Sequence, residues 1–115
     1  MEYKDFETAY ANIISKCGKA LKNNRFAVFV VGDIRDKDGF MVSLRDLTIK
    51  CFGKVGMRLY NDIVLATSLA SASLRAGTPF EINRKITKVH QYVLVFYKGN
   101  TNEIRNNYTK LELDY

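Results

Sequence analysis

The first part of the chain carries a helical spacing of apolar positions. Between residues 5 and 22, apolar side chains recur at the i, i+3, i+4 and i+7 positions that form one buried stripe. Asp5 is suited to cap the start, and the pair Asn23-Asn24 stops the helix. The pattern therefore predicts an amphipathic helix over residues 5–22, with a buried stripe of Phe6, Ala9, Tyr10, Ile13, Ile14, Cys17 and Leu21.

The run from Phe26 to Val31 has a different pattern. It is apolar at every position, rich in β-branched and aromatic residues, and bounded by turn formers such as Gly32-Asp33. Such a run predicts a strand that is buried on both faces, as in the sheet of an α/β protein. The polar segment from Ile34 to Gly39 that follows it predicts a loop.

A second helix is predicted after this loop. Ser43 and Asp46 resemble a capping box with Asp in place of Glu, and Gly56 is a plausible C′ residue. Between them the helical spacing returns. The expected buried stripe contains Leu44, Leu47, Thr48, Cys51, Phe52 and Val55.

Two further strands are predicted over about residues 60–67 and 90–97. The polar and basic segment between them, residues 68–88, is long enough to let them pair antiparallel. The tail after Gly99 is polar, with one helical turn near Glu103 and a short extended piece close to its end. The order helix, strand, helix suggests a parallel sheet, but three or four strands are few for a doubly wound fold. We therefore predict an α/β chain that forms part of a larger sheet.

Length and composition restrict the class of protein. A chain of 115 residues with 47% hydrophobic and 26% charged residues predicts a single domain over residues 1–115. No apolar run approaches the roughly 20 residues that span a bilayer, and no secretory signal is visible, so we expect a cytoplasmic protein. Two lone cysteines argue against a zinc site and a disulfide scaffold. The formal net charge of +6 is compatible with a polyanionic partner but does not require one.

Two long segments resemble characteristic segments of one enzyme family. Residues 25–39 (RFAVFVVGDIRDKDG) and residues 84–99 (RKITKVHQYVLVFYKG) are similar to segments of phage and prophage DNA methylases of the amino-methyltransferase class. Tyr3-Lys-Asp-Phe6 resembles the start of the helix after that family's catalytic motif, and Tyr60-Asn61 matches as well. The similarity runs from about residue 3 to residue 99, in the family's order and spacing.

The resemblance implies a partial Rossmann-like methyltransferase fold over residues 1–99, followed by a polar tail at residues 100–115. The strand at residues 26–31 would be the fifth of the family's sheet. The other two strands would be the sixth and seventh, an antiparallel hairpin at one sheet edge. The two main helices would cover one face of the sheet. The opposite face, and one edge of the strand at residues 26–31, would lack the elements that cover them in the family.

Two motifs that the family needs are missing from the sequence. The family's Asp/Asn-Pro-Pro-Tyr/Phe tetrapeptide binds the target amino group and stacks on the flipped base, but Pro79 is the single proline here. No G-x-G occurs either, so the turn that holds S-adenosylmethionine in full-length relatives is absent. A DNA methylase needs both parts because it flips a base into a pocket beside the methyl donor. We therefore expect no cofactor for the isolated chain. Met1 falls where a family member is still mid-chain, which predicts a split, remnant or internally started gene.

Two sets of residues are candidates for contact with substrate or DNA. The first set follows the buried strand, where an α/β sheet places its site; it forms either a wall of a substrate pocket or a solvated loop with local ion pairs. The second set is basic and either follows a DNA backbone or belongs to an ordinary surface loop. The single histidine is interpreted as a structural residue, and the aromatic residues of the strands are expected in the core. The candidates are Asp33, Arg35, Asp36, Arg75, Arg84, Lys85, Lys88 and His90, and no catalytic, cofactor-binding or metal-binding residue is assigned.

Three functions remain open at this point. The first is a DNA methyltransferase-related fragment, inactive alone, that acts as a homodimer or together with a separately encoded N-terminal half. The second is a non-enzymatic nucleic-acid-binding module that retains the basic loop. The third, an active transferase with an unrecognised cofactor site, is disfavoured by the two missing motifs. Because an uncovered apolar surface usually marks an interface, we expect self-association or pairing with the missing half.

Overall fold

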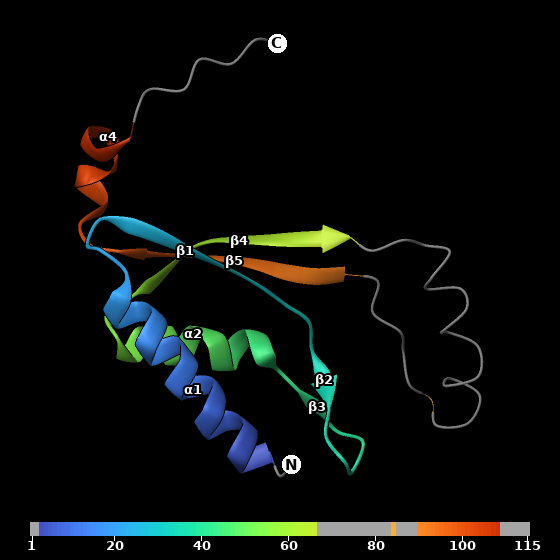
Figure 1. Cartoon of the computed structure of the whole chain (residues 1–115). Coiled ribbons are helices and arrows are strands. Elements are labelled where there is room, and N and C mark those ends of the chain that lie inside the picture. The colour runs from blue at the N-terminus through green and yellow to red at the C-terminus, as the bar shows by residue number, and fades with distance from the viewer. Residues whose placement is uncertain (1–2, 67–83, 85–89, 109–115) are drawn as a thin grey trace.

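The computed structural model describes residues 3–66, 84 and 90–108 (Figure 1). They form an α/β arrangement with a three-stranded sheet, which confirms the predicted fold class. The predicted extended piece near the end of the tail and most of the basic segment lie outside the described residues. The elements are α1 (Tyr3–Ala20), β1 (Arg25–Val31), β2 (Ile34–Arg35), β3 (Met41–Val42), α2 (Leu44–Lys54), β4 (Arg58–Ala66), β5 (His90–Lys98), η1 (Thr101–Glu103) and α4 (Ile104–Asn107).

The sheet has the order β1-β5-β4, and both neighbours of β5 run antiparallel to it. Val95 of β5 pairs with Val28 on one side and with Asn61 on the other. The predicted antiparallel pairing of the last two strands is therefore confirmed. The expected parallel pairing is wrong for the described strands, because β5 lies between β1 and β4, the two strands that share a direction. A bulge at Tyr60 interrupts the register of β4.

Both main helices lie on one face of this sheet (Figure 1). The core forms between them and the strands, with Phe52 of α2 fully buried at its centre. Its ring stacks on Phe96 at 4.2 Å between centroids and meets Phe29 edge-on at 4.9 Å. The aromatic residues of this face are thus core residues, as predicted. The core cluster consists of Ile14, Val31, Leu47, Cys51, Phe52, Met57, Leu94 and Phe96.

The second helix matches its prediction closely. The Ser43 hydroxyl accepts a hydrogen bond from the Asp46 backbone N–H at 3.3 Å, and Gly56 follows the helix with a φ of +80°. Thr48, fully buried, satisfies its hydroxyl with the Leu44 carbonyl and the Tyr10 hydroxyl, each at 2.6 Å. Capping and apolar spacing agree here, so the sequence locates the helix well.

The buried stripe of α1 differs from its prediction. The helix begins before Asp5, so this residue lies in the first turn and is not the cap. Ala9, Ile13 and Cys17 were expected in the core but are exposed, Ile13 to 56%. The buried or half-buried side of the helix is instead formed by Phe6, Tyr10, Ala11, Ile14, Gly18 and the adjoining Leu21.

Gly18 explains this rotation of the helix. A methyl group on its Cα would overlap Cγ2 of Val55, so α1 approaches the end of α2 most closely along the side that carries Gly18. Lys98 fixes the same end of α1, because its ammonium group donates to the carbonyls of Gly18 and Leu21 at 2.6 Å each. The line through Ala9, Ile13 and Cys17 therefore points away from α2.

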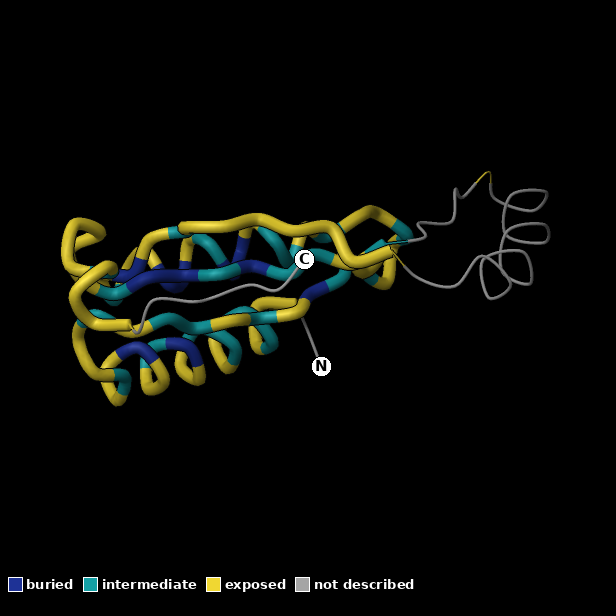
Figure 2. Tube along the Cα trace, turned by 90° about the horizontal axis from the view of Figure 1, so that it is seen from above, coloured by how far each residue is buried: buried dark blue, intermediate teal, exposed yellow. Residues whose placement is uncertain are grey.

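The opposite face of the sheet has no helix over it among the described residues (Figures 1 and 2). Val28 and Val30 of β1 are 57% and 56% exposed. The prediction that β1 is buried on both faces is thus wrong, and among residues 3–66, 84 and 90–108 the predicted uncovered apolar face is present. At one end of this face Tyr108, after α4, packs on Phe26 at 5.5 Å between ring centroids. The predicted helical turn near Glu103 is present as η1 and α4.

None of the helices formed by residues 3–66 and 90–108 is both long and apolar enough to cross a bilayer.

Candidate functional site

The polar segment after β1 folds into a tight hairpin, although a loop was predicted. Strands β2 and β3 pair through Ile34 with Val42 and Arg35 with Met41. Asp36 organises the turn, because one carboxylate oxygen accepts from the backbone N–H groups of Asp38 at 3.0 Å and Phe40 at 2.9 Å. The Asp36 carboxylate therefore serves the loop itself.

The remaining polar groups of the turn are also used within it. The Gly39 N–H donates to the Asp36 carbonyl at 3.0 Å, and its own carbonyl accepts from the Arg35 guanidinium at 2.8 Å. Gly39 has a φ of +91°, which favours glycine. The hairpin thus holds a fixed shape on the carboxyl end of β1.

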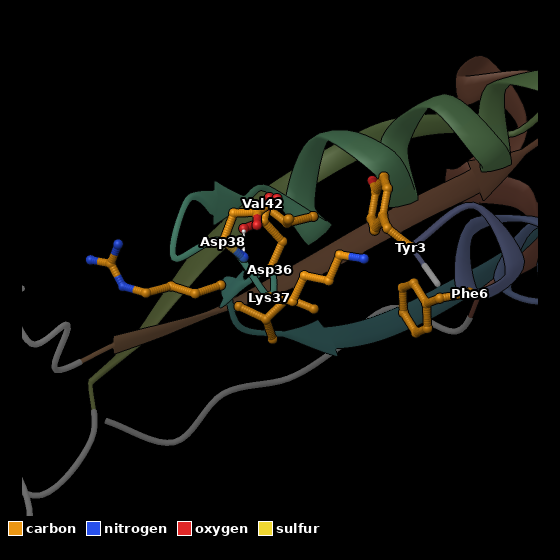
Figure 3. Close-up of a pocket in the computed structure, with 8 residues that line it drawn as sticks. Tyr3, Phe6, Asp36, Lys37, Asp38 and Val42 are labelled. Carbon is orange, nitrogen blue, oxygen red and sulfur yellow. Dashed lines mark hydrogen bonds between the residues drawn. The ribbon is translucent and has the colours of Figure 1, made fainter. Parts of the chain in front are cut away.

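A pocket of about 420 Å³ lies between this hairpin and the first turns of α1 (Figure 3). Tyr3 and Phe6 form the helix side, with their rings stacked at 6.4 Å between centroids. Lys37 extends from the hairpin toward these two rings (Figure 3). The hairpin side of the pocket is lined by Ile34, Arg35, Asp36, Lys37, Asp38 and Val42.

The pocket combines flat apolar surface with cationic donors. The aromatic rings of Tyr3 and Phe6 offer a stacking surface, and Arg35 and Lys37 offer positive charge. Partial burial, and then the nearby Glu7 carboxylate, raise the pKa of the Tyr3 phenol. Such a lining suits a planar, polar ligand that carries negative charge.

Four of the candidate residues from the sequence, Asp33, Arg35, Asp36 and His90, lie at this end of the sheet. Arg35 and Asp36 line the pocket, whereas Asp33 is half-buried directly after β1 and is not among the lining residues. His90 begins β5 and pairs with Ala66, the last residue of β4, at the same end. Arg84 is exposed with a φ of +56°. Arg75, Lys85 and Lys88 lie outside the described residues.

His90 belongs to a small polar cluster. Its Nε2 lies 3.2 Å from the Tyr92 hydroxyl, and the Arg45 guanidinium lies 5.8 Å above the Tyr92 ring. Arg45 donates to the Asp62 carboxylate, with 3.1 Å from Nε, and this hydrogen bond raises the pKa of Arg45. The cluster ties α2 to β4 and β5. The interpretation of His90 as a structural residue agrees with these contacts.

Sequence reasoning missed several members of the site. Tyr3 and Lys37 line the pocket but were not candidates; Tyr3 was noticed only within a segment that resembles a family motif. Arg45 and Asp62 are 17 positions apart, and no local pattern links them. Among residues 3–66, 84 and 90–108, no group of His, Cys, Asp and Glu is placed to hold a metal ion.

The chain is similar to known proteins at the level of three-dimensional structure. No protein-family model matches the chain, and no curated protein matches it. Solved structures do match. A candidate DNA modification methylase from the bacterium Thermus thermophilus, as its selenomethionine derivative, is similar over 96% of this chain with a TM-score of 0.64 at 20% identity.

The same bacterial protein in complex with S-adenosyl-L-methionine matches with a TM-score of 0.63 at 19% identity. The chain has a methyltransferase-like fold. In both matches it spans 41% of the length of the neighbour. The methyltransferase-like chain is therefore similar to a part of a methylase rather than to a whole one.

The described residues of this methyltransferase-like chain do not fit the methyl donor that the fold implies. The connection from β1 to α2 is the hairpin, whose N–H groups at Asp38, Gly39 and Phe40 bond within the turn. They are therefore unavailable to a ligand, and no tight glycine turn among these residues aims backbone donors at an anionic group. No methyl-transfer step is derived from these residues.

Proposed function

We propose that this chain is a DNA methyltransferase-related polypeptide of the amino-methyltransferase class that transfers no methyl group by itself. The observation that carries the proposal is the match of 96% of the chain onto 41% of a candidate DNA modification methylase. The two segments that resemble phage and prophage methylases support it. In this view the chain is a truncated, cytoplasmic relative that provides the distal strands and their covering helices.

The pocket beside the hairpin is one wall of the substrate site in this proposal. Tyr3 and Phe6 would supply flat surface against the target base, and Arg35 and Lys37 would meet phosphate oxygens of the DNA. The basic segment with Arg75, Arg84, Lys85 and Lys88 would extend the contact along the backbone. Asp33, Asp36 and His90 would hold the wall in place.

The donor-binding portion would join the chain on the side of β1. Among the described residues, the outer edge of β1 has no strand beside it. Figure 2 shows that α1 runs along this edge, whereas β4 forms the opposite edge of the sheet. The exposed apolar line of Ala9, Ile13 and Cys17 faces away from α2 and is suited to a further helix. The partner portion is either a separately encoded N-terminal half or a preceding segment of a longer chain.

A methyl-transfer assay tests the proposal. The purified chain is incubated with tritiated S-adenosylmethionine and unmethylated duplex DNA, and we expect no label in the DNA. The same chain produced together with the coding sequence directly upstream is expected to label the DNA. Label transfer by the purified chain alone would contradict the proposal.

A second candidate function is nucleic-acid binding without catalysis. It is favoured by Arg35 and Lys37, exposed cations on one rigid hairpin in a chain of net charge +6. Each phosphate contact adds to the salt dependence of binding. Arg35→Ala with Lys37→Ala should therefore flatten the salt dependence of duplex binding in fluorescence anisotropy. The matched control, Lys50→Ala with Lys54→Ala on the outer side of α2, removes the same charge and should leave the dependence unchanged.

A further inference from the structure

The uncovered face of the sheet is apolar and carries no charged side chain across its described strands. Cross-strand partners point to the same face, so the column that contains the exposed Val28 can be followed through the register. Val28 pairs with Val95 and Val30 with Val93, and on β4 Asn61, Ile63 and Leu65 continue the same rows. The uncovered face, defined by these rows, consists of Val28, Val30, Asn61, Ile63, Leu65, Gln91, Val93 and Val95.

The missing charge is informative in a chain of net charge +6. Two copies of such a chain repel each other at long range, and this repulsion would oppose most modes of self-association. A contact through the uncovered face places only apolar and neutral side chains between the copies. The Lys and Arg residues then stay in water, where salt screens them. A second copy can therefore approach this face at little electrostatic cost.

The size of the face sets the expected affinity. Three strands about 4.8 Å apart, with six residues each at about 3.3 Å, give a footprint on the order of 300 Å² per copy. Apolar patches of roughly this size on a monomer often serve as interaction surfaces. An interface built from two such patches lies at the low end of the range for specific complexes. A stable but weak contact is expected.

We propose that the uncovered face binds a second copy of this chain, so that two sheets pack face to face in a twofold dimer. Sheets pack in this way about 10 Å apart with interdigitating side chains. Val28, Val30 and Ile63, each more than half exposed, provide the contacts near the middle of the face. Tyr108 on Phe26 limits the contact at one end. The outer edge of β1 and the α1 line are not used, so this inference does not depend on the proposed function.

Sedimentation velocity over a concentration series tests the dimer. The chain should shift from 13.2 kDa toward twice this mass with a micromolar dissociation constant. Val30→Lys and Ile63→Lys each place a charge in the contact twice, and each should raise the dissociation constant by about tenfold or more. Added salt should strengthen the association of the unmodified chain, because it screens the repulsion between two +6 copies.

Ile13→Lys is the matched control. Ile13 and Val30 are both 56% exposed, and the substitution is the same, but Ile13 lies on α1 on the other side of the sheet. Its dissociation constant should not change. Circular dichroism checks that each variant is folded, and Val30→Thr, which keeps the side-chain shape, provides a milder second change on the face.

Two results would overturn the inference. The first is an unmodified chain that stays at 13.2 kDa throughout the series; the face would then be left to the donor-binding portion or to residues 109–115. The second is an Ile13→Lys variant that weakens association as strongly as Val30→Lys, which would place the contact on α1 instead.

Discussion

The two faces of the sheet are made from the same few strands but have different surroundings. On the helix-covered face, Phe96 and Leu94 are fully buried beneath α2 and α1. On the uncovered face, Val28 and Val30 of β1 are more than half exposed. They alternate along β1 with Ala27 and Phe29, the partners of Phe96 and Leu94. Both faces are apolar. The difference teaches that the sequence provides a second apolar sheet face, which is suited to pack against structure beyond the described residues.

The helix-covered face should dominate the stability of the isolated chain. Phe52→Ala removes the ring that lies between Phe29 and Phe96 and leaves a cavity that rigid neighbours cannot fill. We expect a loss of about 3–5 kcal/mol in the free energy of unfolding, measured by urea denaturation. A loss below about 1 kcal/mol would mean that this face is not the core.

The contact between the two helices gives an effect of intermediate size. In Gly18→Ala, overlap with Val55 costs about 1–3 kcal/mol and the higher helix propensity of Ala returns about 1 kcal/mol, so a small net loss is expected. In Gly53→Ala nothing lies within 4 Å of the added methyl group, so a gain of up to about 1 kcal/mol is expected. Thermal unfolding of both variants measures the opposite signs. Equal signs would contradict the close approach of α1 to α2.

The cluster that ties α2 to β4 should contribute less. Asp62→Ala removes the partner of Arg45, and both side chains are about one-third exposed (30% and 33%). An ion pair in such a position is worth less than about 1 kcal/mol and weakens further with salt. Urea denaturation at low and high ionic strength measures both properties. A loss of several kcal/mol that salt does not change would assign the pair to the core.

The smallest effect concerns the two cysteines and involves no change in stability. Cys17 is exposed on α1, whereas Cys51 is buried in α2, and burial raises the pKa of the Cys51 thiol. Iodoacetamide should therefore modify Cys17 in the folded chain and Cys51 only after unfolding, as read by mass spectrometry of tryptic peptides. The Cys17→Ser variant should take up no label until denaturant is added. Equal labelling of both thiols would contradict the rotation of α1.

The parts of the fold that the sequence predicts well are those with two agreeing local signals. For α2, the Ser43 cap and the apolar spacing both point to the same residues. For β1, the continuous apolar run is too short and too β-branched for a helix. In α1, two adjacent lines of apolar residues satisfy the helical period equally well. Only the position of α2, fixed by the close approach at Gly18, decides which line is buried.

The candidate site was only partly predictable for a related reason. Arg35 and Asp36 follow a buried strand, and ligands of α/β sheets generally bind at the carboxyl ends of the strands. The sequence does not reveal that the Asp36 carboxylate closes a hairpin turn, because that depends on the backbone amides of Asp38 and Phe40 in three dimensions. Tyr3 reaches the pocket from another element, and no spacing along the chain connects it to the hairpin.

The central claim is that the chain is one portion of a methyltransferase-like fold and that the donor-binding portion lies outside it. Isothermal titration calorimetry with S-adenosylmethionine tests this claim most directly. The account predicts no binding heat for the purified chain at micromolar concentrations of protein and ligand. Stoichiometric binding with a micromolar dissociation constant would contradict it, because the described residues would then have to contain a donor site.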